Sequence, residues 1–136
     1  MKKGILHHIE IYVSNLANSL DFWDWFLSEL GYALFQEWES GCSFKLHDTY
    51  IVFVQTEDRF LDVPYHRCRT GLNHLAFHAD SQQEVDDLTE KLRARGIKIL
   101  YEDRHPHAAS SYGVFFEDPD RIKVEVVLSE NVTSLI

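Results

Sequence analysis

The chain is poor in several residue types, and each shortage excludes a class of protein. Among its 136 residues are only two cysteines, Cys42 and Cys68, too few for a secreted domain held together by disulfides. No apolar run approaches the length of a membrane span. No long apolar segment follows the two lysines at the N-terminus, so no signal peptide is predicted. We therefore expect a cytoplasmic protein with free thiols and no membrane partner.

Basic side chains are also scarce. Lysine and arginine number 13 against 22 aspartates and glutamates, and the formal net charge is −9. Such a surface repels phosphate backbones and anionic lipids, and no basic stripe offsets the repulsion. The composition therefore argues against nucleic acid as a partner.

What the chain does contain is an internal repeat. The run Leu6-His7-His8-Ile9-Glu10-Ile11 is echoed by Leu72-Asn73-His74-Leu75-Ala76-Phe77, and both place a histidine in an apolar strand pattern. Each run is followed by a helical pattern that a glycine ends, Gly31 or Gly96, and then by short strands. The order predicts two β-α-β-β-β units of about sixty residues, each too small to be a separate domain. We expect one domain over residues 1–136, with module one at about 4–56, a linker at about 57–70 and module two at about 71–129.

The first repeat gives detailed expectations. Alternation predicts a strand over residues 5–13, with Ile5, Ile9 and Ile11 on the face that packs on a helix. In the helix that follows, Trp25 lies opposite the apolar stripe with Phe22 on its flank. A tryptophan that faces water indicates either a partner surface or a single, partly shielded aromatic side chain.

Strand parity brings three polar residues to equivalent faces. Side chains alternate across a strand, and His8, His74 and Glu125 each lie opposite the apolar face of their own strand. All three should therefore line a concavity that water or a ligand can reach. Two imidazoles and one carboxylate suit a divalent metal ion and leave up to three coordination positions open. His7 shares the parity of the buried isoleucines and is not expected to bind.

The stretches that hold these residues resemble the vicinal oxygen chelate superfamily, the glyoxalase/bleomycin-resistance/extradiol-dioxygenase group. The matching stretches are Leu6-His7-His8-Ile9, Val13-Ser14-Asn15-Leu16, Ser19 to Trp23, Leu30-Gly31-Tyr32, Gly71 to Phe77, and Phe116-Glu117-Asp118-Pro119-Asp120 through Glu125. The resemblance implies an α+β fold in which two βαβββ modules form a cup-shaped, mostly antiparallel sheet. It implies a divalent metal ion (iron, manganese, zinc, nickel or cobalt) held by His8, His74 and Glu125. It also implies a homodimer in which His8 of one subunit meets His74 and Glu125 of the other.

The function implied is that of a metal-dependent glyoxalase-like or dioxygenase-like enzyme that chelates vicinal oxygens of a small substrate. It would be a lyase or isomerase, or an oxygen-dependent dioxygenase. Of the neighbouring polar groups, His78 shares the face of His74, and Tyr112 begins a later strand, so both are candidates for proton transfer. A ligand-sequestering resistance protein without catalysis remains open. So does an antibiotic-modifying thiol transferase, although no basic residue follows the last strand between Ser129 and Ile136.

Two departures from the family pattern concern the fourth ligand and a turn. Many glyoxalase I enzymes have a glutamate on the fourth strand, and alignment of residues 48–53 with residues 120–125 puts Phe53 at that position. Phenylalanine cannot bind a metal, but Gln55 has the same parity and could replace the ligand. Arg121 stands where the family usually has a glycine in a turn.

Overall fold

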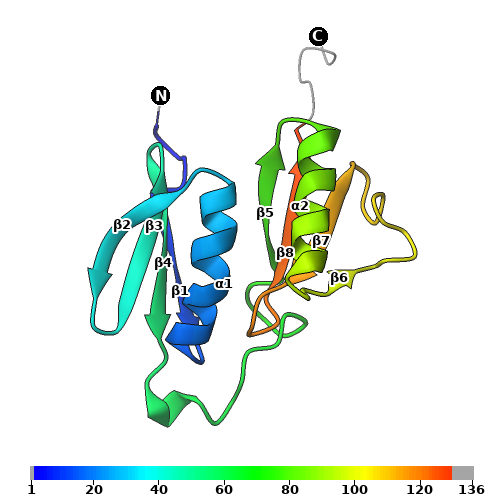
Figure 1. The fold of residues 1–136 in the computed structure, drawn as a ribbon. Coiled ribbons are helices and arrows are strands. Elements are labelled where there is room, and N and C mark those ends of the chain that lie inside the picture. The colour runs from blue at the N-terminus through cyan, green and yellow to red at the C-terminus, as the bar shows by residue number, and fades with distance from the viewer. Residues whose placement is uncertain (1, 130–136) are drawn as a thin grey trace. The chain divides into compact units, whose positions relative to one another are not determined.

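The computed structural model describes residues 2–129, which fold as two modules of one design (Figure 1). The chain divides into two compact units between Tyr65 and His66, inside the segment expected as a linker. The first module contains β1 (His8–Val13), α1 (Leu16–Glu29), β2 (Ala33–Trp38), β3 (Gly41–Leu46), β4 (Thr49–Gln55) and a short 3-10 helix (Asp58–Phe60). The second contains β5 (His74–Ala79), α2 (Gln82–Ala94), β6 (Ile99–Leu100), β7 (Gly113–Glu117) and β8 (Lys123–Leu128). The predicted α+β fold of two βαβββ modules is confirmed.

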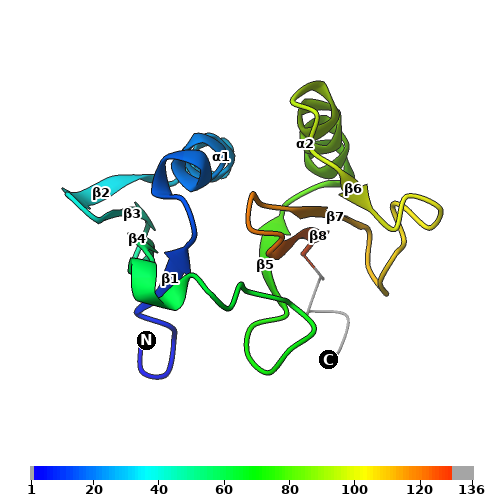
Figure 2. The same ribbon diagram turned by 90° about the horizontal axis from the view of Figure 1, so that it is seen from below.

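Each module is a four-stranded sheet with one helix on one face (Figure 2). The strand orders are β1-β4-β3-β2 and β5-β8-β7-β6, and they are equivalent under the repeat. The first and last strands of each module pair in parallel, and the other neighbours are antiparallel. Within residues 2–129, neither helix has the length and apolar character needed to cross a membrane.

Aromatic side chains dominate the core of module one. Trp23, Phe26 and Phe53 are fully buried, and the Trp23 and Phe53 ring centroids lie 4.9 Å apart between α1 and β4. Phe22, expected on the flank of the exposed side, is buried instead, with 6% of its surface accessible. Trp25 is half-buried and its ring lies edge-on to Phe22. Trp25 is thus a partly shielded aromatic side chain.

Module two has a mainly aliphatic core, and the first turn of its helix is capped by side chains. Val85 and Leu92 of α2 are fully buried, as are the strand residues Val114, Phe116 and Val124. The Ser81 hydroxyl accepts the Glu84 N–H, which is one half of a capping box. The Glu84 carboxylate, however, accepts the N–H of Asp80 and not that of Ser81. Gly31 and Gly96 end the two helices with positive φ angles of 95° and 75°, which glycine adopts without steric cost.

The first strand is shorter than predicted. It begins at His8, because His8 pairs with Tyr50 near the start of β4 and the facing chain turns away before Thr49. Ile5 is therefore 70% exposed and packs on no helix. His7 precedes the strand, so strand parity does not govern it; its exposed ring lies edge-on to His8, not among the isoleucines.

Candidate metal-binding site

Two of the predicted ligands lie together in module two. In the parallel pairing of β5 with β8, His74 lies opposite Lys123 and Ala76 lies opposite Glu125. His74 and Glu125 are thus diagonal neighbours on one face of the sheet. The Nε2 atom of His74 lies 3.3 Å from Oε1 of Glu125.

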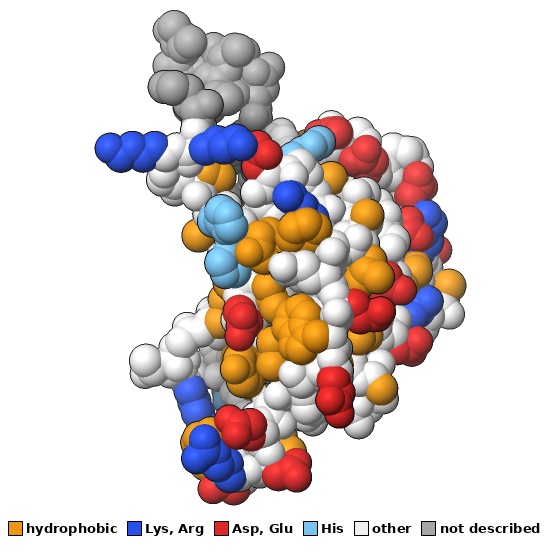
Figure 3. All heavy atoms as spheres, turned by 90° about the vertical axis from the view of Figure 1, so that its left-hand side faces the viewer, with side chains coloured by type: hydrophobic (Ala, Val, Ile, Leu, Met, Phe, Trp, Pro, Cys, Tyr) orange, Lys and Arg blue, Asp and Glu red, His pale blue; other side chains and the backbone are white. Residues whose placement is uncertain are grey.

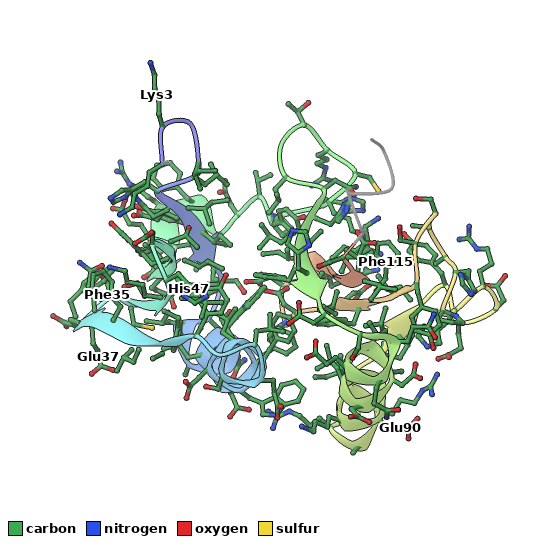
Figure 4. The ribbon with its side chains drawn as sticks, turned by 90° about the horizontal axis from the view of Figure 1, so that it is seen from above. Lys3, Phe35, Glu37, His47, Glu90 and Phe115 are labelled. Carbon is green, nitrogen blue, oxygen red and sulfur yellow. The ribbon has the colours of Figure 1, made fainter. Side chains whose placement is uncertain are left out.

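Glu125 is a buried carboxylate, with 8% of its surface accessible. Phe115 of β7, labelled in Figure 4, lies opposite it across the sheet, and its ring is 6.0 Å from that of His74. The nearby cation Lys123 donates from Nζ to the Tyr101 hydroxyl at 3.1 Å. Lys123 thus does not pair with Glu125, and among residues 2–129 the one ion-pair partner of Glu125 is His74. A buried carboxylate is costly unless a cation or donors compensate it, so this position favours a bound positive charge.

The spacing of the two donor atoms fits a shared metal ion. Nitrogen and oxygen ligands lie about 2.1 Å from a divalent ion such as Zn²⁺, so two of them at bond angles near 90–109° are about 3.0–3.4 Å apart. The observed 3.3 Å between His74 and Glu125 falls in this range. Nδ1 of His74 is in turn engaged by the side-chain oxygen of Asn73 at 2.8 Å, a partner of the type that supports metal-bound histidines.

The third predicted ligand, His8, occupies the equivalent position in module one. It begins β1 as His74 begins β5, and it lies opposite Tyr50 as His74 lies opposite Lys123. The His8 ring is exposed and stacks on Tyr50 at a centroid distance of 4.7 Å. Within residues 2–129, no three His, Cys, Asp or Glu side chains lie close enough to form a complete metal site.

The structure corrects the expectation for a fourth ligand. Val52 lies opposite Glu10 as Glu125 lies opposite Ala76, so Val52, and not Phe53, is the counterpart of Glu125. Phe53 is fully buried against Trp23 on the helix side. The expected alignment was one residue out of register.

Gln55 is engaged by the start of α1. Its Oε1 accepts the N–H of Leu16 at 2.8 Å, and its Nε2 donates to the Ser14 carbonyl at 2.9 Å. Both ends of the side-chain amide are therefore used to join β4 to the first turn of the helix. Gln55 does not take the place of a metal ligand.

The two predicted proton-transfer residues have different surroundings. His78 is exposed on the His74 side of β5, and its Nδ1 lies 3.0 Å from the Ser129 hydroxyl. Tyr112 precedes β7 and donates its hydroxyl to Asp86 of α2 at 2.5 Å. This hydrogen bond is the main cause that raises the pKa of Tyr112 above its ordinary value. The structure thus places the Tyr112 hydroxyl on the helix side of the sheet, apart from His74 and Glu125.

Module one also exposes a group of apolar side chains on its outer strand. Figure 3 shows hydrophobic side chains gathered on this side of the module, and Leu34, Phe35 and Trp38 of β2 are 56%, 45% and 43% exposed. The Phe35 ring lies 5.2 Å from Tyr50, which stacks on His8. The rings of Phe35 and Tyr50 therefore form a continuous series of contacts from β2, at the edge of the sheet, to His8, the predicted ligand of this module.

Two repeated βαβββ modules, each a four-stranded mixed sheet with one helix on one face, define the fold class of the protein. The family model of the Glyoxalase/Bleomycin resistance protein/Dioxygenase superfamily matches residues 5–126. The chain belongs to this superfamily, and the predicted resemblance is confirmed. Members of the superfamily commonly use divalent metals, bind small molecules and often dimerise.

Individual relatives extend over almost the whole chain. The uncharacterized protein YqjT of Bacillus subtilis (strain 168) is 59% identical over 124 residues, which cover 90% of this chain and 97% of that protein. A crystal structure of a "putative glyoxalase" from Bacillus halodurans is also 59% identical, with a TM-score of 0.92 and coverage of 94% and 98%. The glutathione transferase FosA of Serratia marcescens is 26% identical over 121 residues, which cover 89% of this chain and 78% of FosA. The fosfomycin resistance protein FosX of Listeria monocytogenes shares the fold, with 21% identity, a TM-score of 0.71 and coverage of 97% and 96%.

Proposed function

We propose that this protein is a divalent-metal-dependent enzyme of the glyoxalase-like or dioxygenase-like type that acts on a small substrate with vicinal oxygens. His74, Glu125 and His8 would hold the ion. The observation on which the proposal depends is the buried Glu125 carboxylate 3.3 Å from the Nε2 atom of His74. Superfamily membership supports the same chemistry, because its members commonly use divalent metals.

The residues have distinct roles in this proposal. A bound ion would supply Lewis-acid stabilisation for the negative charge that develops on the substrate oxygens. Glu125 contributes the negative ligand, and its burial strengthens the attraction for a cation because the surrounding dielectric constant is low. His78, exposed on the same face of β5, is the residue that we expect to accept or return a proton.

We also propose that the protein is a homodimer in which His8 of the partner subunit completes the ligand set. Frequent dimerisation in the superfamily supports this arrangement.

The expected compartment is the cytoplasm, which agrees with two free cysteines, Cys42 and Cys68.

The test is elemental analysis of protein that was purified without a metal-affinity tag. We expect about one divalent ion per chain and its loss in Glu125→Gln, which keeps the shape of the side chain but removes its charge. Glu90→Gln is the matched control, because Glu90 lies on α2 and points away from the sheet (Figure 4). Wild-type protein that stays metal-free after exposure to iron, manganese, nickel, cobalt and zinc would refute the metal-dependent function and favour a ligand-sequestering protein.

A thiol transferase is the second candidate, and the 26% identity to the glutathione transferase FosA favours it. The three candidate reaction classes differ in the co-substrate that they consume. Metal-dependent loss of glutathione thiol in the presence of fosfomycin would favour the transferase. Metal-dependent oxygen uptake with a small vicinal diol would favour the dioxygenase, and turnover that consumes neither co-substrate would favour the lyase or isomerase.

A further inference from the structure

We propose that Asn73 is a positioning residue that holds the imidazole of His74 in its Nδ1–H form, so that Nε2 presents a lone pair toward the metal position beside Glu125. The inference rests on the proposed metal-binding function and deepens it, because it assigns a role to a residue that is not itself a ligand.

The orientation of the Asn73 amide follows from its second contact. Its Nδ2 donates to the main-chain carbonyl of Arg67 at 3.0 Å. A carbonyl oxygen can only accept, so the NH₂ group must face Arg67, and the amide oxygen must face the ring of His74. That oxygen lies 2.8 Å from Nδ1 of His74, and an amide oxygen accepts only, so Nδ1 must carry the hydrogen.

The position of the Arg67 carbonyl is fixed because the side chain of Arg67 makes two hydrogen bonds. The guanidinium Nη1 donates to Glu117 at 2.9 Å and to the carbonyl of Arg121 at 3.0 Å. The side chains of this ion pair are largely buried, with 17% and 14% of their surfaces accessible. Asn73 is thereby tied to the end of β7 and to the turn that precedes β8, the strand that contains Glu125.

The tautomer decides whether the site can accept an ion. With hydrogen on Nδ1, a neutral His74 directs the Nε2 lone pair at Oε1 of Glu125, and two acceptors 3.3 Å apart can share a metal ion or a proton placed between them. In the other tautomer, Nε2–H would donate directly to Glu125 and satisfy the carboxylate without a metal ion. By selecting the first tautomer, Asn73 keeps His74 and Glu125 available to a shared ion.

In module one, too, the side chain of the preceding residue contacts Nδ1 of the strand histidine, but that residue is a histidine. His7 precedes His8 as Asn73 precedes His74, and Nδ1 of His7 lies 2.8 Å from Nδ1 of His8. In both modules, therefore, a side-chain atom of the residue before the strand histidine lies within hydrogen-bond distance of Nδ1, and in module one either ring can be the donor. The repetition favours a role for Asn73 that concerns the histidine, beyond the stability of the local turn.

The experiment compares Asn73→Leu with Asn73→Asp, and uses Gln83→Leu as the matched control on the exposed side of α2. The first readout is the tautomer of His74 in metal-free protein, from long-range ¹H–¹⁵N spectra of protein labelled with ¹⁵N-histidine. The His74 signals are those that His74→Ala removes. The second readout is the dissociation constant for Zn²⁺, measured by competition with a chromophoric chelator.

We expect wild-type His74 to be in the Nδ1–H form and Asn73→Leu to lose this form and bind Zn²⁺ about 10- to 100-fold more weakly. Asn73→Asp keeps an acceptor for Nδ1–H and should restore both readouts, and Gln83→Leu should match wild type. An unchanged His74 tautomer in Asn73→Leu, or an unchanged Zn²⁺ affinity where the wild type binds the ion, would overturn the inference. If wild-type protein binds no ion, the proposed function fails separately, and the tautomer spectra alone decide the role of Asn73.

Discussion

The side-chain amide of Gln55 provides a sharp test that separates a structural role from a metal-ligand role. Replacement by methionine keeps nearly the same length and volume but removes both hydrogen-bonding groups. The Leu16 N–H then loses its acceptor at 2.8 Å, and the Ser14 carbonyl loses its donor at 2.9 Å. The third contact, with the carbonyl of Thr56, is longer at 3.2 Å and local in sequence, so it adds little.

Two hydrogen bonds of about 1 kcal/mol each give an expected loss of about 2 kcal/mol in the free energy of unfolding for Gln55→Met. This corresponds to a fall in Tm of roughly 5–10 °C for a chain of this size. The Asn15 cap of α1 accepts the Asn18 N–H independently of Gln55, so the helix itself should persist. Metal content should stay at the wild-type value, because neither end of the amide is available to an ion.

The assay is urea unfolding followed by circular dichroism, alongside elemental analysis of the same preparations. Gln83→Met is the matched control, because Gln83 lies on α2 and its one side-chain bond, to Asp87, is exposed. A loss of less than about 0.5 kcal/mol for Gln55→Met, equal to that of the control, would refute the account of the two bonds. Loss of the metal ion with unchanged stability would instead restore Gln55 as a ligand.

Three further outcomes are expected. Mixing unfolded His8→Ala and Glu125→Gln chains and refolding them together should restore metal to about a quarter of the wild-type level, because half of the dimers form one intact site out of two; no restoration would refute sharing of ligands between subunits. Ellman's reagent at pH 8 should label Cys68 rapidly and Cys42 only on unfolding, because Cys42 is 2% exposed and burial, aided by nearby carboxylates, raises its pKa to about 11. Rapid labelling that persists in Cys68→Ser would contradict this. Gly41→Ala would place a methyl group 2.5 Å from a main-chain oxygen of the facing strand, and should lower the free energy of unfolding in urea by about 1–3 kcal/mol; wild-type stability would show that the strands can separate freely there.

Features that depend on short stretches of sequence were predictable. Gly31 and Gly96 marked the helix ends, where the backbone takes positive φ. The side on which His74 lies also followed from alternation along one strand, which is a local property.

Features that depend on pairing between distant segments could not be predicted from the sequence. The alignment of the two last strands failed by one residue because the turns before them differ. The turn before β4 has His47 at φ 52°, whereas the longer turn before β8 has Arg121 at φ 67° and is held by the Asp118 side chain, which accepts the Ile122 N–H. A slip of one residue exchanges the two faces of a strand, and this is why Gln55 was placed on the wrong side. The bond from Tyr112 to Asp86 joins residues 26 positions apart and left no signal in the sequence pattern.

The corrected register also explains why the duplicated chain would need both modules for its proposed site. Each module begins its first strand with a histidine whose Nδ1 is engaged by the preceding residue. Only module two has a carboxylate on its last strand, because Val52 takes the place of Glu125 in module one. In this proposal module one would contribute one ligand and module two would contribute two, and an isolated copy of either module could not provide all three.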